Sequence, residues 1–494
     1  MTRKKRHTPP APPSGTALVQ NALESYRPLL SQEDFAALQA ELQQPLRNAL
    51  RLNPLKADVQ RDLPRWAERY GWQLRPIPYC KEGFWVEAAQ TPISQTPEHA
   101  LGFYYIQDAA SMLPVELFDL PPEPLILDLA ASPGGKTTHL VAKTGDRGLV
   151  LANDASRSRL TALRIVLNNW GASSTAITNF PGEAFGDWLP DTFDAVLLDA
   201  PCSMENLRPT DSHPMRPISA RERSNLAQRQ ARLLHSALRA VRPGGQVVYS
   251  TCTLAAEEDE GVLNQVLREL GHAVQLDELT QRLPNPAPGL TTDGTQAYDP
   301  IVQRAVRLWP HRFGTSGFFA ARLTRTGPLP PLQRSTPLPS RPLQGTGWQA
   351  LSQAESNALC AAFEEHYGFD LCAALMTLGC QAWRWGKTYH ALPERYLTRF
   401  ASLPVHAVGL PIGEETSEGI LPAQEWVARF APQFQRGHYH TSAAAFEAGL
   451  RGQPLPYDPV LADCDCPYPI LIDETGRLLG RASVSAGWVK PLRR

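Results

Sequence analysis

Two cysteines in this chain each stand directly after an apolar stretch with the length and composition of a buried strand. Cys202 follows DAVLLDAP and Cys252 follows GQVVYST. A lone cysteine is most often an inert, buried small residue. Two of them at strand ends, each followed by Ser or Thr, favour a chemical role, because the thiolate is the form in which cysteine bonds covalently to substrates. We therefore predict that both thiols converge on one pocket.

Two thiols in one pocket suit methyl transfer to carbon 5 of cytosine. This carbon is too weak a nucleophile to take a methyl group from a sulfonium, but a thiolate that adds at carbon 6 turns the ring into a reactive enamine. The carbon 5 proton must then leave and the thiol must be expelled, which requires a second acid or base. An attacking thiol also needs a cation or a helix N-terminus beside it. Lys136 and a helix expected to begin near Thr253 are the candidates, and Asp199 is expected to hydrogen-bond the cytosine edge.

The segment LILDLAASPGGKTTHLVAK predicts a ligand-binding loop between a buried strand at 125–129 and a helix that opens near Lys136. Adjacent glycines let the backbone approach a ligand, and the free N–H groups of a helix start attract a carboxylate or a phosphate. A P-loop would need glycine where Ala130 stands, so nucleoside triphosphate binding is disfavoured. The residues expected to bind the cofactor here are Ala130, Ala131, Ser132, Pro133, Gly134, Gly135 and Lys136.

Asp154 ends the next strand-like segment, where an acidic residue can accept both hydroxyl groups of a bound ribose. S-adenosylmethionine and NAD both carry such a ribose. The loop lacks the G-x-G-x-x-G pattern of dinucleotide sites, which favours S-adenosylmethionine. The alternative interpretation of Asp154 is the N-cap of the helical segment that follows it. This chemistry needs no metal ion, and we expect none.

These side chains need a scaffold that brings the ends of several strands together. Between residues 125 and 323, strand-like apolar runs alternate with helix-length amphipathic stretches, which indicates βαβ units and a Rossmann-like, doubly wound α/β domain. Ligands of such a sheet bind outside the carboxyl ends of its strands. Asp154, Asp199 and both cysteines fall at these ends.

The rest of the chain is expected to form smaller units around this domain. The expected segments are a disordered tail at 1–15, an α+β module at 16–108, the catalytic domain at 109–325, a Pro-rich linker at 326–345, a helical and mixed region at 346–430, and a domain of short strands at 431–494.

The composition gives no strong indication of a nucleic-acid ligand. The 494 residues include 48 Lys and Arg and 49 Asp and Glu, a formal net charge of −1. Positive charge for RNA must therefore be local. Eight cysteines in a chain of this length are too sparse for a disulfide scaffold and fit a reducing compartment. No apolar run of about 18 residues is present, so we expect an unprocessed cytoplasmic protein that does not bind membranes. We also expect a monomer.

Eight segments, each a modest signal alone, occur in an order that is specific. The chain resembles the RNA (cytosine-5) methyltransferases of the Sun/Fmu type, and most closely their bacterial small-subunit ribosomal RNA branch, called RsmF. The segments that carry the resemblance are ALRLNPLK, GFYYIQDAASMLPV, AASPGGKT, LANDAS, LLDAPCS, YSTCTLAAEEDE, LWPHRFGTSGFF and GRLLGRASVSAGWVKP.

The resemblance implies a role for each matching position. Cys252 would be the nucleophile, and Cys202 would assist release of the product. The loop from Ala130 to Lys136 would hold S-adenosylmethionine, Asp154 its ribose, and Asp199 either the cofactor or the target base. It also implies small-subunit ribosomal RNA as the partner, an RNA-binding N-terminal module, and a PUA-like RNA-binding domain at 431–494.

Two departures from the family pattern accompany this resemblance. The family usually has S-G-E-G after the first cysteine, whereas Met204 and Asn206 replace both glycines here, which predicts a different backbone path. Pro181 stands where the family usually has an Asp that contacts adenine, and Asn179 or a water is the candidate substitute.

Three further functions are compatible with parts of this pattern. A DNA cytosine methyltransferase would use a Pro-Cys nucleophile and so shift the role to Cys202, but the Thr-Cys-Thr segment and the flanking modules argue against it. The sequence also leaves open a tRNA cytosine-5 methyltransferase and a catalytically silent RNA-binding assembly factor.

Overall fold

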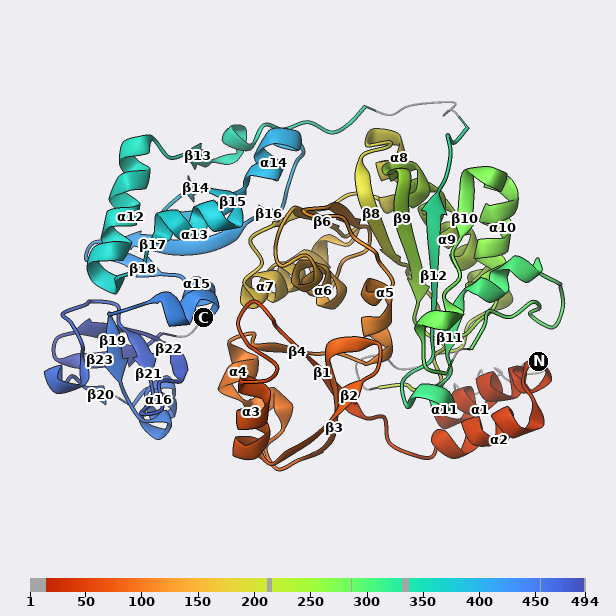
Figure 1. The fold of residues 1–494 in the computed structure, drawn as a ribbon, viewed down its shortest axis with the longest axis horizontal. Helices are drawn as coiled ribbons and strands as arrows, with labels where there is room; N and C mark the ends of the chain where they lie inside the picture. The colour runs from red at the N-terminus through yellow and green to blue at the C-terminus, as the bar shows by residue number, and fades with distance from the viewer. Residues whose placement is uncertain (1–14, 211–215, 286, 331–336, 454, 493–494) are drawn as a thin grey trace, which may run out of the picture.

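The structure is a computed structural model that describes residues 15–210, 216–285, 287–330, 337–453 and 455–492. The predicted tail at 1–15, apart from Gly15, and the centre of the Pro-rich linker lie outside these residues. Figure 1 shows a large α/β domain in the middle and right, an N-terminal unit below it and a C-terminal region at the left. Within the described ranges, none of the helices combines the length and apolar character needed to cross a membrane.

The α/β domain contains a mixed sheet with the strand order β10-β12-β9-β8-β5-β6-β7-β16, and β11 pairs with β12 outside this path. The strands β5, β6, β7, β8 and β9 are mutually parallel. The predicted Rossmann-like doubly wound sheet is confirmed. The strands are β5 (Leu125–Asp128), β6 (Leu149–Asn153), β7 (Thr175–Thr178), β8 (Phe193–Asp199), β9 (Val241–Thr251), β10 (Val274–Leu276), β11 (Val306–Leu308), β12 (Phe318–Arg325) and β16 (Ala407–Val408).

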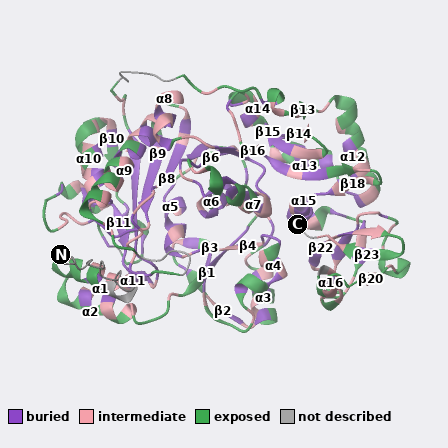
Figure 2. Cartoon of the chain, turned by 180° about the vertical axis from the view of Figure 1, so that it is seen from behind, coloured by how far each residue is buried: buried purple, intermediate pink, exposed green. Residues whose placement is uncertain are grey.

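Helices cover both faces of this sheet, because successive strand residues point to opposite sides. Ile126 packs with α6 (Gly135–Lys143) and α7 (Leu160–Trp170), whereas its neighbour Leu127 packs with α9 (Ala220–Ala240) and α10 (Glu260–Leu270). The central strands are accordingly buried along most of their length (Figure 2). From β5 the chain adds β6 and β7 on one side and then crosses back to add β8 on the other side, and such a reversal of strand order is the point where these sheets bind ligands.

The N-terminal unit has two parts. Its helices α1 (Gly15–Ser25) and α2 (Gln32–Glu41) pack against Trp309 and Leu254 of the catalytic domain. An antiparallel sheet of order β2-β3-β1-β4 follows. Its elements are β1 (Asn48–Leu52), α3 (Asp62–Tyr70), β2 (Trp72–Ile77), β3 (Cys80–Ala89), α4 (Pro97–Ala100) and β4 (Tyr104–Ile106), and α5 (Leu113–Glu116) leads into the catalytic sheet.

The ALRLNPLK segment (residues 49–56), which has the pattern R-x-N-x-x-K, docks on α6 and α7. Arg51 donates hydrogen bonds to the carbonyl of Gly135 (2.9 Å) and to Thr138 (2.8 Å) at the start of α6. Asn53 and Lys56 donate to carbonyls at the end of α7, at 2.8 Å and 2.7 Å. All three side chains are buried. The segment therefore holds the first turn of α6 in place.

The C-terminal region contains two further sheets. The first has the order β13-β14-β15-β17-β18 and the second β19-β21-β22-β23-β20. Their elements are β13 (Trp348–Ala350), α12 (Gln353–Tyr367), α13 (Leu371–Leu378), β14 (Cys380–Trp385), β15 (Thr388–Pro393), α14 (Glu394–Arg399), β17 (Leu410–Thr416), β18 (Gly419–Pro422), α15 (Gln424–Phe430), β19 (His438–His440), α16 (Ala443–Leu450), β20 (Leu455–Pro456), β21 (Ile470–Ile472), β22 (Leu478–Ser485) and β23 (Trp488–Pro491).

Several contacts join this region to the catalytic domain, among them a strand pairing and a buried ion pair. The short strand β16 pairs antiparallel with β7 and so extends the catalytic sheet. Arg429 of α15 donates to the carboxylate of Asp146 and to the carbonyl of Gly171. The sequence predicts a separate region from residue 346 onward, but β16 of this region is a strand of the catalytic sheet.

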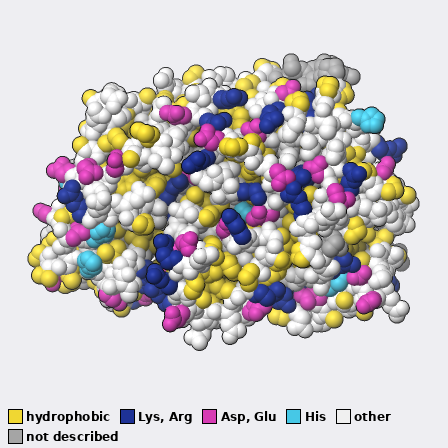
Figure 3. All heavy atoms as spheres, viewed as in Figure 1, with side chains coloured by type: hydrophobic (Ala, Val, Ile, Leu, Met, Phe, Trp, Pro, Cys, Tyr) yellow, Lys and Arg dark blue, Asp and Glu magenta, His cyan; other side chains and the backbone are white. Residues whose placement is uncertain are grey.

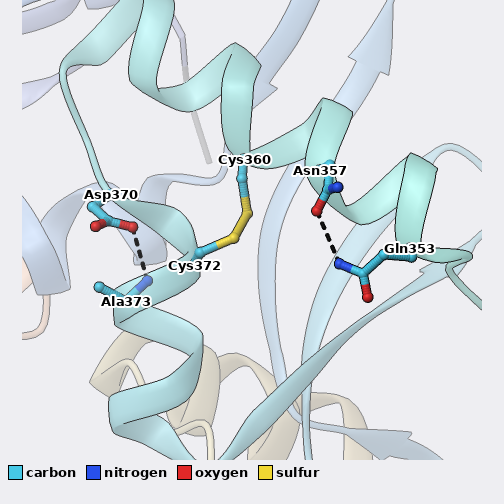
Figure 4. Close-up of a disulfide and its surroundings, with 6 residues drawn as sticks. All are labelled: Gln353, Asn357, Cys360, Asp370, Cys372 and Ala373. Atoms are coloured by element: carbon cyan, nitrogen blue, oxygen red, sulfur yellow. Dashed lines mark hydrogen bonds between the residues drawn. A yellow bond between two sulfur atoms is a disulfide. The ribbon is translucent and has the colours of Figure 1, made fainter.

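A disulfide joins two helices of the C-terminal region (Figure 4). Cys360 of α12 and Cys372 of α13 are bonded, with their Cα atoms 5.9 Å apart. The other six cysteines are free thiols. The sequence predicted no disulfide scaffold but did not indicate this single pair, which the short connection between α12 and α13 at 368–370 brings together.

Candidate active site

The two predicted cysteines meet at the carboxyl edge of the sheet. Cys202 lies three residues after β8 and Cys252 directly after β9, and β8 and β9 are paired in parallel. Their sulfur atoms are 3.2 Å apart, and both side chains are half-buried. The pKa of the Cys202 thiol is raised well above its ordinary range, first by the hydrogen bond to Cys252 and then by burial. Either thiol can be the donor in this contact, so Cys202 can donate a hydrogen bond to the sulfur of Cys252.

Hydrogen bonds between the two cysteine loops maintain this contact. The hydroxyl groups of Ser203 and Thr253 lie 3.0 Å apart. The amide of Leu254 donates to the carbonyl of Glu205 at 3.1 Å. Each residue that follows a cysteine is therefore tied to the opposite loop, so the two sulfurs are held together by their neighbours.

The helix expected to begin near Thr253 begins seven residues later, at Glu260. That prediction is wrong, because the intervening acidic residues are used in tertiary contacts. Asp259 accepts a hydrogen bond from the hydroxyl of Thr251 at 2.5 Å, and Glu260 accepts from Arg307 at 2.5 Å and 2.7 Å. Arg307 also donates to the carbonyl of Leu254 at 2.9 Å. This ion cluster, rather than a helix N-terminus, supports the Cys252 loop.

Replacing Arg307 with methionine is expected to lower the free energy of unfolding by about 3–5 kcal/mol, because two buried carboxylates would lose their cation. The side chains of Arg307, Asp259 and Glu260 are all fully buried. Urea denaturation of the full chain, followed by tryptophan fluorescence, measures the change. Arg268→Met on the exposed face of α10 is the control and should change stability by no more than about 0.5 kcal/mol. Equal stability of the two variants would contradict this role of Arg307.

Lys136 and Asp199 form an ion pair at the same edge of the sheet as the two cysteines. The ammonium group of Lys136 lies 2.6 Å from Asp199 and 2.8 Å from the hydroxyl of Ser111. Ser250 donates to the other oxygen of Asp199 at 2.8 Å. We predicted Lys136 as a cation for the attacking thiol, but among the described contacts its partner is Asp199. Because Lys136 belongs to the cofactor loop and Ser250 precedes Cys252 by two residues, Asp199 links the two parts of the site.

The loop from Ala130 to Gly134 connects β5 to α6 as expected and suits a ligand with hydrogen-bond donors. Gly134 has a φ of +115°, and a Cβ atom there would come within 2.9 Å of Val166. Asp128, at the end of β5, has one oxygen bonded to Thr137 at 2.7 Å, and its other oxygen is buried without a partner among the described residues. Burial raises the pKa of Asp128 to about 7. Within the same described ranges, Ser132 has a buried hydroxyl without a partner. These orphaned atoms fit the polar groups of S-adenosylmethionine.

Asp154 is held at the same loop. Its carboxylate accepts from the amide of Ser132 at 3.1 Å and from that of Ser156 at 2.8 Å. Ser156 is the N-cap of the short helical turn that follows, and Arg159 is the N-cap of α7. The interpretation of Asp154 as an N-cap is therefore wrong. The sequence analysis missed Arg159, which donates to the carbonyl of Ser132 at 2.5 Å and lies 3.7 Å from Asp154. The available signal was a basic residue five positions after Asp154.

The two departures from the family pattern have local explanations. Met204 has a φ of +61°, so the chain keeps a left-handed conformation at this position without glycine, at a cost of about 1–2 kcal/mol. Asn179 donates from its side-chain nitrogen to the carbonyl of Asp154 at 2.7 Å, which places it beside the predicted ribose site. Pro181 is the N-cap of a short helical turn. The contact to adenine stays a prediction.

A separate buried cluster contains Cys80, Glu116 and His139, whose ligand-type atoms lie within 4.8 Å of one another. Nε2 of His139 lies 3.0 Å from Glu116, and Lys143 donates to the same carboxylate at 3.0 Å. Burial lowers the pKa of His139 to about 4, so the ring is neutral near pH 7. The carboxylate is therefore already satisfied by Lys143 and His139. The expectation of no metal ion stays a prediction.

A Rossmann-like sheet with a small-residue loop after β5, where the strand order reverses, is a fold that methyltransferases use. Comparison with known proteins places this chain in the same class. The family described as 16S rRNA methyltransferase RsmB/F matches residues 115–324. The family described as the N-terminal domain of 16S rRNA methyltransferase RsmF matches residues 18–109.

Similar proteins include ribosomal RNA small subunit methyltransferase F of Klebsiella pneumoniae, 35% identical over 81% of this chain and 80% of that protein. The protein of the same name from Citrobacter koseri is 33% identical over 88% and 87%. The match to the Erwinia tasmaniensis protein is 41% identical but spans 62% of that protein. This chain belongs to the family of 16S rRNA methyltransferase F, whose members use S-adenosylmethionine.

Solved structures show the same fold. A methyltransferase homolog from Pyrococcus horikoshii is 30% identical, with a TM-score of 0.52, and covers 62% of this chain and 99% of its own. NSun6 from Pyrococcus horikoshii, solved with the S-adenosylmethionine analogue SFG, is 20% identical with a TM-score of 0.52 and covers 62% of this chain and 98% of its own.

Proposed function

We propose that this protein transfers a methyl group from S-adenosylmethionine to carbon 5 of cytosine in 16S ribosomal RNA, through a covalent bond to Cys252. The observation that carries the proposal is the sulfur pair, 3.2 Å apart, at the same sheet edge as an ion pair between Asp199 and Lys136 of the loop after β5. The chemistry requires a nucleophile, a second group for release and a hydrogen-bonding group for the ring. The site contains one candidate for each.

In the first step, the thiolate of Cys252 forms a bond to carbon 6, and the electron pair of the carbon 5–carbon 6 double bond makes carbon 5 nucleophilic. Asp199 is oriented by Lys136 and Ser250 so that it can hydrogen-bond the cytosine edge and assist protonation of the ring nitrogen. S-adenosylmethionine, when bound, supplies the electrophilic methyl group that carbon 5 takes. The loop from Ala130 to Lys136 would hold the methionine part, and Asp154 the ribose.

In the release step, the carbon 5 proton passes to water and its electron pair re-forms the ring double bond. The bond from carbon 6 to the Cys252 sulfur breaks, and the pair returns to the sulfur as a thiolate. The Cys202 thiol then donates a hydrogen bond to this departing sulfur, the same contact that joins the two side chains in the free protein. We assign the roles in this direction because Cys252 stands in the Thr-Cys-Thr segment that resembles the nucleophile motif of the family, whereas the contact itself allows either sulfur to be the donor.

Asp154→Asn is expected to weaken binding of S-adenosylmethionine about tenfold or more, because a hydrogen bond to a charged acceptor contributes about 1.5–3 kcal/mol. Isothermal titration calorimetry of the full chain with the cofactor measures the change. Asp187→Asn in α8 (Phe185–Trp188) is the matched control and should bind as the unmodified protein does. Unchanged affinity in Asp154→Asn would remove this residue from the cofactor site.

A direct test separates rRNA methylation from tRNA methylation and from silent binding. The protein is mixed with labelled S-adenosylmethionine and total RNA from a strain that lacks the gene, and the labelled RNA is identified by size. Label in small-subunit rRNA as 5-methylcytosine supports the proposal, and label in tRNA supports a tRNA enzyme. Tight RNA binding without transfer would support a silent assembly factor.

We propose that the flanking units, 16–108 and 346–494, position the RNA, and that 431–494 is a PUA-like domain. Exposed positive charge supports this near the cofactor edge, where Arg157 and Arg164 lie at the surface. Lys and Arg are otherwise interspersed with Asp and Glu on the face in Figure 3. Burial and Arg164 lower the pKa of His390 in β15 to about 4, so positive charge of α7 faces the C-terminal region. We further propose a cytoplasmic monomer.

A further inference from the structure

The peptide groups on both sides of Cys202 are held by one buried pair of side chains. The amide of Ser203 donates to Oε2 of Glu258 at 3.0 Å. Nε2 of Gln230 donates to the carbonyl of Pro201 at 2.9 Å and to the same oxygen of Glu258 at 2.9 Å. Glu258 and Gln230 are fully buried. No sequence motif near Cys202 indicates these partners, which come from α9 and from the turn before α10.

The carboxylate of Glu258 is also an electrostatic neighbour of the Cys202 sulfur. Its second oxygen has no hydrogen-bond partner among the described residues, and the nearest cation, Arg223, is 3.7 Å away and is bound more closely by Glu205 at 2.5 Å. A negative charge that is incompletely neutralised disfavours a thiolate beside it. The charged or titratable groups around Cys202 are Cys252 and Tyr249 of β9 and its end, Glu258, and Arg223 of α9.

From this arrangement we propose that Glu258 and Gln230 are positioning residues for Cys202. The pair fixes the orientation of the thiol, and the charge of Glu258 keeps it protonated so that it can donate to the departing Cys252 sulfur. This inference rests on the proposed function. It extends that function because the sulfur of Cys252 carries no charge once it is bonded to cytosine, and Glu258 is then the negatively charged group that still acts on Cys202.

The two contributions can be separated with two substitutions. Glu258→Gln removes the charge but keeps an oxygen that can accept both N–H groups. Gln230→Leu removes the bond to the Pro201 carbonyl but keeps the charge. Glu257→Gln is the matched control. It removes the same charge at the neighbouring position, and Glu257 lies at the same 3.7 Å from Arg223, but its side chain is exposed. Cofactor affinity serves as a test of folding for each variant.

The measurement is the decay rate of the protein–RNA adduct in a rapid-quench experiment with target RNA and S-adenosylmethionine between pH 6 and 10. In Glu258→Gln we expect the rate near pH 7 to stay within about twofold, and the alkaline fall of the rate to move to lower pH by up to about one unit, because the thiol loses its proton more easily. In Gln230→Leu we expect release to be slower, by about tenfold, at every pH, with the alkaline fall unmoved.

An alkaline fall at the same pH in Glu258→Gln and in the unmodified protein would overturn the role of the charge. Equal release rates in Gln230→Leu and the Glu257→Gln control would overturn the role of the clamp. These two outcomes can be distinguished from a failure of the proposed function. The proposed function predicts that Cys202→Ala forms an adduct with RNA. Absence of any adduct in Cys202→Ala removes the proposed function itself.

Discussion

Cys252→Ala is expected to abolish methyl transfer, with a loss on the order of 10⁴-fold or more, as is typical when the nucleophile of a covalent catalyst is removed. Without the sulfur, carbon 6 cannot be attacked and carbon 5 stays too weak a nucleophile. Transfer of labelled methyl groups to RNA measures activity, and a denaturing gel measures the adduct. Both signals should disappear.

The matched control for this substitution is Cys464→Ala. Its thiol is half-buried like that of Cys252 but lies in the C-terminal region, against the carbonyl of His366. This variant should retain full activity. Binding of S-adenosylmethionine to Cys252→Ala should persist, which separates loss of chemistry from loss of folding. A denaturation-resistant adduct formed by Cys252→Ala would reverse the roles of the two cysteines.

Cys202→Ala is expected to have an equally large effect of the opposite kind. Attack and methyl transfer proceed, but the departing sulfur lacks its hydrogen-bond donor, so the protein accumulates as a covalent adduct with RNA. We expect close to one methyl group transferred per protein molecule, followed by turnover slower by a factor of about 10²–10⁴, the usual contribution of acid–base catalysis. The adduct should survive a denaturing gel and disappear after ribonuclease digestion.

The double substitution Cys202→Ala with Cys252→Ala is the control for the trapped state. It should form no adduct, because the remaining site holds no sulfur. Full turnover by Cys202→Ala would mean that another group supports the leaving thiolate and that the 3.2 Å contact between the sulfurs has no part in release.

Most of the catalytic scaffold could be predicted because its signals are local. Alternation of apolar runs and amphipathic helices predicted the parallel sheet, and the small residues after β5 predicted the loop at which α6 begins. The position of each cysteine just beyond a strand followed from the same pattern. The start of α10 did not, because Asp259 and Glu260 are drawn into contacts with Thr251 and Arg307 that no local pattern indicates.

Interactions between distant segments account for the other differences. Strand β16 joins the catalytic sheet from a segment more than 200 positions beyond β7, and two residues of such a strand carry no usable periodicity. The residues of the R-x-N-x-x-K segment bind catalytic helices rather than facing solvent. Cys360 and Cys372 are brought together by the turn between two helices.

The sequence by itself determined which residues are the candidates for the chemistry: two thiols, an acidic residue proposed for ribose and a glycine loop, each recognisable from its neighbours in the chain. Tertiary structure decided how they act. The pairing of β8 with β9 sets the distance between the sulfurs, Lys136 binds Asp199 rather than a thiol, and Gln230 and Glu258 hold Cys202. The physical reason is range: strand and turn preferences act over a few residues, whereas hydrogen bonds and charges depend on which segments folding brings into contact.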